Sequence, residues 1–233
     1  MSLLTVGNPK LLKGLKKGYL SSVLHFAPAT LSGKEVCPKR TLGCTSACLN
    51  LAGRGGIFKK GESTNVIQQA RIRKTKAFFE NRQAFLNELK VEIIKTKAKA
   101  EKQGLIPVFR LNGTSDLAWE KYEVSNGKNI FQTFPEVQFY DYTKINNRKV
   151  SHIPNYHLTF SKADGNDMDV RIAISNGMNV AVVFHKLPET YLGRTVINGD
   201  ETDLRFLDPK SVIVGLKAKG KAKKDTSGFV VSI

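Results

Sequence analysis

The sequence lacks the features that would direct a chain into a membrane or a secretory pathway. None of its 233 residues belongs to an apolar run long enough to cross a bilayer. The lysines near the N-terminus are not followed by a continuous apolar stretch with a small-residue cleavage site, so no secretion signal is predicted. We therefore expect a cytoplasmic protein without a membrane partner.

Widespread catalytic signatures are missing as well. The sequence has no nucleotide-binding P-loop, no G-x-S-x-G and no H-E-x-x-H pattern. The motifs typical of P-loop hydrolases, serine hydrolases and zinc proteases are therefore missing. It also has no internal repeat and no linker-like segment. A single domain over residues 1–233 is expected, with a basic arm at 1–18 and a basic segment at 217–233.

Acidic residues are too few to balance the basic ones. The chain has 37 lysines and arginines against 20 aspartates and glutamates, which gives a net charge of +17. A surplus of this size indicates a polyanionic partner, most often a nucleic acid, although it can reflect only a lysine-rich proteome. The residues predicted to contact phosphates lie on a long basic helix and in the basic C-terminal run: Arg71, Lys74, Lys217, Lys219 and Lys221.

Cysteine is absent everywhere except in one short segment. Cys37, Cys44 and Cys48 have the spacing C-x6-C-x3-C. Three soft ligands on one loop predict an iron–sulfur cluster, or a zinc ion with a fourth ligand from elsewhere. A disulfide with one free thiol and a group of inert buried thiols remain as alternatives, but the odd count favours a reducing compartment. Thiols that share one metal ion should bring their sulfurs to about 4 Å from one another.

Alternation of apolar runs with helical patterns predicts an α/β fold. Continuous apolar runs, typical of parallel strands buried on both faces, occur six times, at 19–29, 106–111, 137–140, 156–160, 179–184 and 211–216. One long helix is expected from Ser63 or Thr64 to Gln103, and shorter helices at 117–122, 143–147 and 168–176. We expect a single, mostly parallel sheet of about six strands, open or curled into a partial (β/α) barrel.

Polar residues follow each of these apolar runs. Because parallel strands deliver their following loops to one edge of the sheet, the residues after them should share a cavity with the three thiols. The residues expected there, as ligand-binding groups, are Asn112, Gly113, Ser115, Asp116, Asp141, Ser161 and His185, with 217–221 on the rim.

Other polar residues are weaker candidates. His25 and His185 fall near strand ends and would suit a metal site, although a core or surface role is more common for a lone histidine. Asp200, Asp203 and Asp208 would suit a magnesium-dependent nuclease, but turn and capping roles explain them equally well. The sequence Asn198-Gly199-Asp200 is typical of a hairpin turn.

The order of strand, three-cysteine loop, helix and further βα units resembles the radical-SAM architecture. In that family, three cysteines after the first strand hold a [4Fe–4S] cluster whose open iron binds S-adenosylmethionine. The resemblance implies that residues 112–116 contact the methionine amino group and that Ser161 meets the ribose. The chain departs from the family in its cysteine spacing, which is usually C-x3-C-x2-C, and in having Ala47 before the last cysteine instead of an aromatic residue.

A more specific resemblance covers nearly the whole chain. The segments L-H-F-A-P-A, C-x6-C-x3-C-L-N-x-A-G-R-G-G, R-L-N-G-T-S-D, F-Y-D-Y-T-K, L-R-F-L-D and V-G-L-K-A-K-G-K-A-x-x-D-T-S-G-F resemble a family of small tailed-bacteriophage proteins. That resemblance implies a phage gene expressed in the host cytoplasm and does not indicate which reaction, if any, the protein catalyses.

The sequence therefore predicts an iron–sulfur, radical-SAM-like enzyme that acts on a nucleic acid or a nucleotide. Its cofactors would be a [4Fe–4S] cluster, with zinc as the alternative, and S-adenosylmethionine. The competing hypothesis is a non-catalytic phage protein that binds nucleic acid or a host factor, in which the cysteine loop is a structural clip. The catalytic residues and the oligomeric state stay open at this stage.

Overall fold

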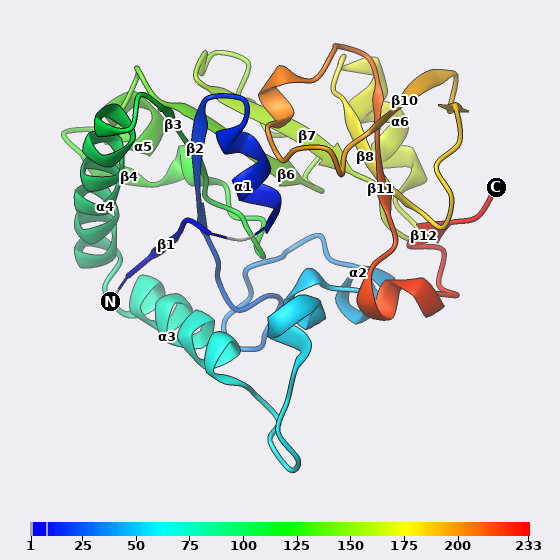
Figure 1. Ribbon diagram of the computed structural model, residues 1–233, viewed down its shortest axis with the longest axis horizontal. Coiled ribbons are helices and arrows are strands. Elements are labelled where there is room, and N and C mark those ends of the chain that lie inside the picture. Colours follow the sequence, from blue (N-terminus) through cyan, green and yellow to red (C-terminus); the bar gives the residue numbers. More distant parts are fainter. Residues whose placement is uncertain (1, 8) are drawn as a thin grey trace.

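The computed structural model describes residues 2–7 and 9–233, which form an α/β fold around one ten-stranded sheet (Figure 1). Six strands in chain order make its parallel middle: β2 (Tyr19–Leu24), β3 (Ile106–Arg110), β6 (Gln138–Thr143), β7 (Tyr156–Ser161), β8 (Val180–Phe184) and β11 (Ile213–Lys217). These are the six apolar runs of the sequence, so the prediction of a mostly parallel sheet is confirmed.

Short strands extend the sheet at both edges. β1 (Leu4–Thr5) pairs antiparallel with β2, β10 (Arg194–Asn198) pairs parallel with β11, and β9 (Thr190–Tyr191) pairs antiparallel with β10. The expected hairpin at Asn198-Gly199-Asp200 is therefore wrong, because β10 and β11 run the same way and a short 3-10 helix, η4 (Arg205–Leu207), lies between them. Within the described ranges β1 and β9 do not pair with each other, and curling into a partial barrel is not shown.

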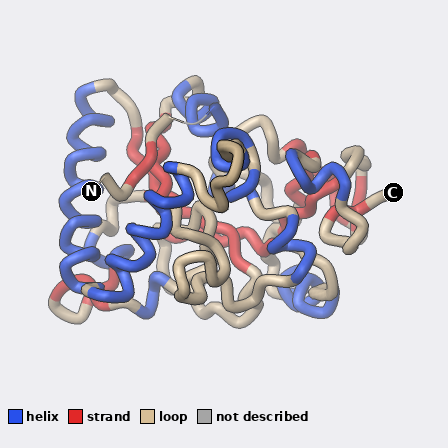
Figure 2. Tube along the Cα trace, turned by 90° about the horizontal axis from the view of Figure 1, so that it is seen from below, coloured by secondary structure: helices blue, strands red, loops and turns tan. Residues whose placement is uncertain are grey.

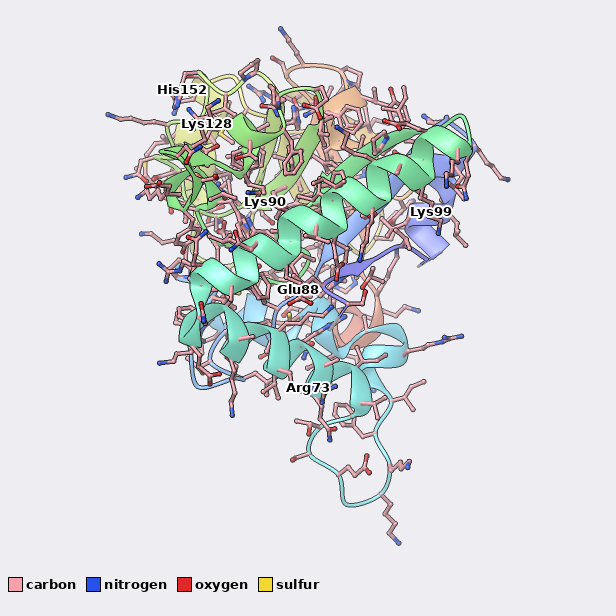
Figure 3. The ribbon with its side chains drawn as sticks, turned by 90° about the vertical axis from the view of Figure 1, so that its left-hand side faces the viewer. Arg73, Glu88, Lys90, Lys99, Lys128 and His152 are labelled. Atoms are coloured by element: carbon pink, nitrogen blue, oxygen red, sulfur yellow. The ribbon has the colours of Figure 1, made fainter. Side chains whose placement is uncertain are left out.

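The expected long helix is two helices. α3 (Val66–Glu80) and α4 (Arg82–Lys102) are separated by Asn81, whose φ of −144° and ψ of 80° are not helical and whose side chain accepts a hydrogen bond from Ala84 N at 3.0 Å. Asn65, not Ser63 or Thr64, caps the start of α3. Figure 3 shows α3 and α4 running in different directions, with α4 across the outside of the sheet.

Successive side chains of a strand point to opposite faces of the sheet, and both faces of this sheet carry buried core residues. On one face Phe109 and Phe139 join the main core, to which α3 and α4 contribute Phe78 and Phe85. On the other face the neighbouring strand residues Val108 and Tyr140 pack under η4. Further helices are α1 (Pro9–Leu15), which packs on β2, and α5 (Ile130–Thr133). α6 (Asp167–Ser175) packs on β7 and β8 and confirms the helix predicted at 168–176.

The carboxyl edge of the sheet is covered by loops and short helices. The cysteine segment crosses it with α2 (Leu42–Ser46), η1 (Leu49–Leu51) and η2 (Gly53–Gly56), and the C-terminal segment adds η5 (Gly220–Lys224) and β12 (Val230–Val231). Figure 1 shows α2 and the red C-terminal segment below the strands, and Figure 2 shows loops filling this side. The helices in the described part of the chain include none with the length and apolar character of a membrane span.

Two strands pair with the same side of β8 at different positions along it. β7 pairs with β8 only at the start of β8, through Phe160 and Ser161, whereas β12 pairs with the end of β8 at Val183 and Phe184. β7 therefore ends beside the start of β8, and the C-terminal strand β12 pairs with the part of β8 that extends beyond the end of β7.

Candidate functional site

A cavity of about 390 Å³ lies at the carboxyl edge of the parallel strands. Its wall contains residues that end or follow β2, β3, β6, β7, β10 and β11, together with the cysteine segment and α3. The predicted site residues among them are Cys37, Cys44, Cys48, Asn112, Gly113, Ser115, Asp116, Ser161, Arg71, Lys217 and Lys219. The structure thus brings most of the predicted site together, as the parallel-strand argument requires.

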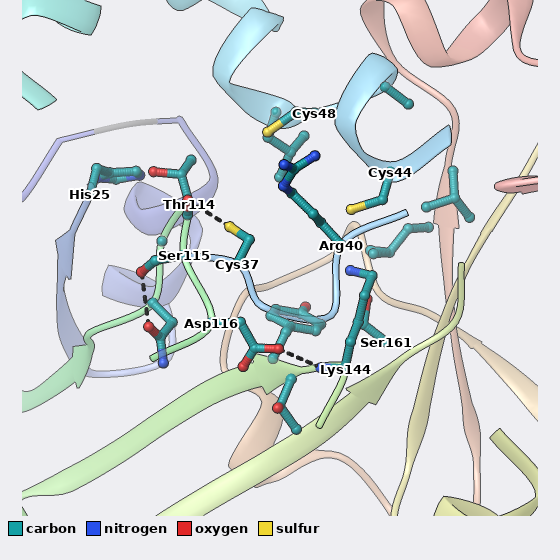
Figure 4. A pocket seen from close by; sticks show the side chains of 18 of the residues that line it. His25, Cys37, Arg40, Cys44, Cys48, Thr114, Ser115, Asp116, Lys144 and Ser161 are labelled. Atoms are coloured by element: carbon teal, nitrogen blue, oxygen red, sulfur yellow. Dashed lines mark hydrogen bonds between the residues drawn. The ribbon is translucent and has the colours of Figure 1, made fainter. Parts of the chain in front are cut away.

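The three thiols reach the cavity from different parts of one segment. Cys37 lies in the loop after β2, Cys44 lies within α2, and Cys48 is the N-cap residue of η1. All three are free cysteines that line the same cavity, and Figure 4 shows their side chains around a shared space with the side chain of Arg40. The alternative of a disulfide with one free thiol is therefore not what the structure shows.

Weak hydrogen bonds fix two of the sulfurs. Cys37 Sγ accepts from Ala29 N at 3.4 Å and donates to the carbonyl of Thr114 at 3.8 Å, and Cys48 Sγ accepts from Asn50 N at 3.5 Å. Burial, reinforced by the nearby Cys48 and Asp116, raises the pKa of Cys37 to about 12. Burial also raises the pKa of Cys48. Without a bound metal both side chains are protonated at neutral pH, which disfavours a role as nucleophiles.

The helix that carries Cys44 is held by a residue far away in the sequence. Asp164, in the loop after β7, accepts hydrogen bonds from Gly43 N at 3.1 Å, from Cys44 N at 3.2 Å and from the Thr41 hydroxyl. A Cβ atom on Gly43 would lie 2.0 Å from Ser227 Oγ, so the C-terminal segment closes on the same turn. α2 is therefore fixed between two other loops of the carboxyl edge.

The glycines after Cys48 allow the chain to fold back on itself. A Cβ atom on Gly56 would lie 2.3 Å from the carbonyl oxygen of Leu51, and one on Gly55 would lie 2.7 Å from that of Asn50. The fold-back presents the Asn50 side chain to α3, where it accepts a hydrogen bond from Arg71 Nη1 at 2.5 Å. The glycine-rich stretch thereby connects the cysteine segment to α3.

Donor groups for a single metal ion are not assembled at this site. Among residues 2–7 and 9–233, no three side chains of histidine, cysteine, aspartate or glutamate are grouped as they would be around one ion. The thiols therefore surround a common space instead of meeting at one point, and sulfurs about 4 Å apart are not shown. The same segment also lines a second, neighbouring cavity of about 350 Å³, through Cys37, Arg40, Cys44 and Cys48.

The side chain of Asn112 makes hydrogen bonds to other residues of the protein. Its Oδ1 accepts from Ser115 Oγ at 2.8 Å, from Leu117 N at 2.9 Å and from Trp119 Nε1 at 3.2 Å, and its Nδ2 donates to the Leu117 carbonyl at 3.0 Å. Asn112 is only 2% exposed. These bonds shape the turn after β3, so Asn112 lines the cavity as a structural residue.

Asp116 is held at the cavity wall by the neighbouring strand. Its Oδ2 accepts from Lys144 N at 2.7 Å (Figure 4). Arg148 Nη1 lies 3.8 Å from its Oδ1. Burial raises the pKa of Asp116, although these donors and cations oppose the shift. Ser161, at the end of β7, also reaches the cavity.

Two residues expected in the cavity lie elsewhere. Asp141 is fully buried in the sheet, where its carboxylate accepts from Asn112 N at 2.7 Å and from the Tyr156 hydroxyl at 3.0 Å. It lies within β6 and not after it, so its side chain points into the core. His185 is exposed, and its backbone N–H donates to Val231, because β12 occupies that position beside β8.

The basic residues predicted to contact phosphates separate into three kinds. Arg71, Lys217 and Lys219 line the cavity, and Lys221 is exposed on η5. Lys74 is buried, and its Nζ donates to the carbonyl of Leu3 at 2.7 Å. The expectation that Lys74 lies on an open basic face is therefore wrong, because this side chain ties α3 to the N-terminal strand.

The three aspartates of the nuclease hypothesis also separate. Asp200 pairs with Lys219 at 2.6 Å, Asp203 with Arg110 at 3.1 Å and Asp208 with Arg205 at 3.1 Å. Each carboxylate thus has its own cation, and the described residues contain no group of three acidic side chains that could hold a metal ion. The three carboxylates therefore do not form a shared magnesium site in the part of the chain that the structure describes.

Three cations of the cavity were not among the predicted site residues. Arg40 stands between the first two cysteines, Arg110 is the last residue of β3, and Lys144 follows β6. Their positions in the sequence carried a usable signal, since each one lies in the cysteine loop or at the carboxyl end of an apolar run. Arg40 Nε is bound to Glu35 at 2.9 Å, and Arg110 lies over the ring of Tyr142.

A family model described as Gene product 88 matches residues 2–233. The chain belongs to the Gene product 88 family. The match covers almost the whole chain and is consistent with the phage protein family expected from the sequence. No curated protein and no solved structure matched the chain, so the comparisons add no support for the resemblance to radical-SAM proteins.

Proposed function

We propose that this Gene product 88 chain is an iron–sulfur enzyme of the host cytoplasm, with Cys37, Cys44 and Cys48 as the ligands of a [4Fe–4S] cluster. One observation carries the proposal: the chain's only three thiols line one cavity together with the polar residues that follow the parallel strands. In α/β folds this edge of the sheet is where binding and catalytic groups gather.

The arrangement of the thiols favours a cluster over zinc. One zinc ion needs its sulfurs about 4 Å apart, and no such group is present in the described residues. In a [4Fe–4S] cluster each thiolate binds a different iron, so the ligands must stand around a space and not at one point. Three thiols leave the fourth iron without a protein ligand from this set.

The chain's own residues would then have separate tasks. Cys37, Cys44 and Cys48 would hold the cluster, and Asp116 and Ser161 would bind a cosubstrate in the same cavity, with Gly113 and Ser115 in the turn beside them. Such a cluster, when bound, would supply an electron for the cleavage of S-adenosylmethionine. Asn112 would act by shaping the turn, because its side chain is already hydrogen-bonded.

The test is metal and sulfide analysis of protein purified without oxygen. We expect brown protein with iron and sulfide in equal amounts, and loss of most of the iron in Cys37→Ser, Cys44→Ser and Cys48→Ser. Ser115→Ala, which changes another residue of the same cavity, should keep its iron. Colourless protein after anaerobic reconstitution with iron and sulfide, or uptake of one zinc ion per chain, would rule out the cluster.

A second candidate is the non-catalytic nucleic-acid-binding protein, and the exposed lysines of the C-terminal segment favour it. Lys221, Lys223 and Lys224 project from η5 beside the cavity rim. If they contact phosphates, replacing all three with glutamine should reduce the slope of log K against log salt by about 2 to 3. A slope unchanged by the triple substitution would leave no role for them in nucleic-acid binding.

A further inference from the structure

The cavity wall carries more positive than negative charge. Its cations are Arg40, Arg71, Arg110, Lys144, Lys217 and Lys219, and its carboxylates are Asp116, Asp200 and Asp203. Each carboxylate is already engaged, with Arg148, Lys219 and Arg110 respectively. The wall therefore has a positive surplus that its own residues do not neutralise.

Arg71 is the positively charged residue that α3 contributes to the cavity wall. Its side chain is half-buried, and in the part of the chain that the structure describes no carboxylate lies within ion-pair distance of it. One of its nitrogens donates to Asn50 Oδ1 at 2.5 Å, which fixes the guanidinium at the cavity. Burial lowers the pKa of Arg71. A guanidinium removed from water without a counter-charge is costly, so an anion at this position would stabilise it.

Arg110 lines the same cavity as Arg71. It is held by Asp203 at 3.1 Å and lies 4.7 Å from the centre of the Tyr142 ring, while its buried Nε has no hydrogen-bond partner among residues 2–7 and 9–233. His25, which follows β2, lines the cavity near both arginines. Burial, together with Arg71, Arg110 and Lys74, lowers the pKa of His25 to about 3. The imidazole is thus neutral and can donate one hydrogen bond in a region of positive potential.

We propose that Arg71, Arg110 and His25 form a phosphate subsite and that the cavity binds a nucleotide-sized phosphate monoester. Two guanidinium groups with planar sets of donors match the oxygens of a phosphate. A volume of about 390 Å³ is in the range of small-molecule sites. A nucleic-acid strand needs an extended groove with successive stacking platforms, which this single cavity does not supply.

This inference rests on the proposed function in one respect, since it names the substrate class of the same cavity. Phosphate binding nevertheless does not require the cluster, because none of the three subsite residues is a cysteine. Iron and sulfide analysis therefore tests the cluster, and phosphate binding to metal-free protein tests the subsite. Either can fail while the other succeeds.

The experiment is calorimetric titration of metal-free protein at pH 7 with inorganic phosphate, adenosine 5′-monophosphate and adenosine. We expect the monophosphate to bind and adenosine to bind at least about tenfold more weakly, as the loss of a charge-assisted hydrogen bond predicts. Arg71→Gln should weaken the monophosphate about tenfold or more. Arg73→Gln is the matched control, because Arg73 has the same charge on the same helix but is exposed (Figure 3).

A second measurement covers the case in which Arg71→Gln does not fold. In wild-type protein the imidazole signal of His25, identified by its loss in His25→Gln, should titrate at a higher pH when inorganic phosphate is bound, because an anion favours the imidazolium. Equal binding of adenosine and its monophosphate, equal effects of Arg71→Gln and Arg73→Gln, or binding of an oligonucleotide but not of phosphate would overturn the proposal.

Discussion

Asp164 accepts a hydrogen bond from the backbone N–H of Cys44 at 3.2 Å, although 120 positions separate the two residues in the sequence. The same carboxylate accepts from Gly43 N and from the Thr41 hydroxyl. The loop after β7 therefore determines where the middle cysteine stands in the cavity. Fold and site are coupled through this contact, since α2 is only five residues long and cannot hold its place alone.

Replacing Asp164 should release the cysteine helix. Asp164→Ala removes the acceptor for three donors at the start of α2, and the free energy of unfolding should fall by about 1–2 kcal/mol, as for the loss of a helix cap. Cys44 should then react faster with a thiol reagent, by about tenfold, because the turn opens more often. Alkylation followed by mass spectrometry of the Cys44 peptide measures this rate.

Asp167→Ala is the control for that variant. Asp167 lies three positions further on and its side chain is 68% exposed, and it pairs with the buried Lys162. Its removal should leave the reactivity of Cys44 unchanged, because Asp167 makes no contact with the turn at Thr41–Cys44. If both variants alter the Cys44 rate equally, the contact with Asp164 does not position the cysteine.

The contact between Gly43 and Ser227 predicts a rescue. In Gly43→Ala the new Cβ would lie 2.0 Å from Ser227 Oγ and 2.6 Å from Asp164 Oδ1, so overpacking should cost about 1–3 kcal/mol. Adding Ser227→Ala removes the nearer of these atoms and should restore part of the stability, whereas Ser227→Ala alone should cost less. Urea denaturation of the four proteins gives the coupling energy, and additive effects would mean that the two segments do not touch.

The parallel middle of the sheet was predictable because its cause is local. Each strand is a continuous apolar run ended by polar residues, and six such runs predict six strands whose loops meet at one edge. That argument placed Cys37, Asp116 and Ser161 on one cavity without any knowledge of their contacts. It says nothing about where a strand ends to the nearest residue, which is why Asp141 was expected outside β6.

The predictions that were wrong concern side chains whose positions depend on contacts with residues far away in the sequence. Nothing near Lys74 indicates that its ammonium group reaches the carbonyl of Leu3, and nothing near His185 indicates that β12 will cover that end of β8. The break between α3 and α4 had a local signal in Asn81, a good capping residue. The continuous helical pattern on both sides of Asn81 concealed it.

A further prediction separates a structural role for Asn112 from a role in ligand binding. Asn112→Ala leaves the Ser115 hydroxyl, the Leu117 N–H and the indole N–H of Trp119 without their acceptor in a buried region, so the free energy of unfolding should fall by about 3 kcal/mol or more without any ligand. Ser115→Ala removes only one of these bonds and should cost about 1 kcal/mol. Equal, small losses in thermal or urea denaturation would contradict the structural role.

Asp141 predicts a pH dependence of stability with a definite sign. Complete burial raises its pKa from 3.8 to about 7, against the opposing effects of the Asn112 N–H, of Arg110 and Arg148, and of the Tyr156 hydroxyl. Between these two values the folded protein keeps a proton that the unfolded chain has released. Raising the pH through this window therefore lowers the free energy of unfolding, at up to about 1.4 kcal/mol for each pH unit. The effect is complete about one pH unit above this pKa, where the folded protein has also released the proton.

The Asp141→Asn variant isolates this titration, because it keeps an oxygen acceptor for Asn112 N but has no ionisable group at position 141. All other carboxylates are common to the two proteins, so their titrations cancel when the free energies of unfolding are subtracted. The difference, wild type minus variant, should fall by about 4 kcal/mol between about pH 4 and about pH 8 and then stay level. Urea denaturation at each pH measures it, provided that the m-values agree. A difference that is constant from pH 4 to pH 8, or that rises with pH, would show that Asp141 is ionised in the folded protein over this range and that Asn112, Tyr156 and the two arginines outweigh its burial.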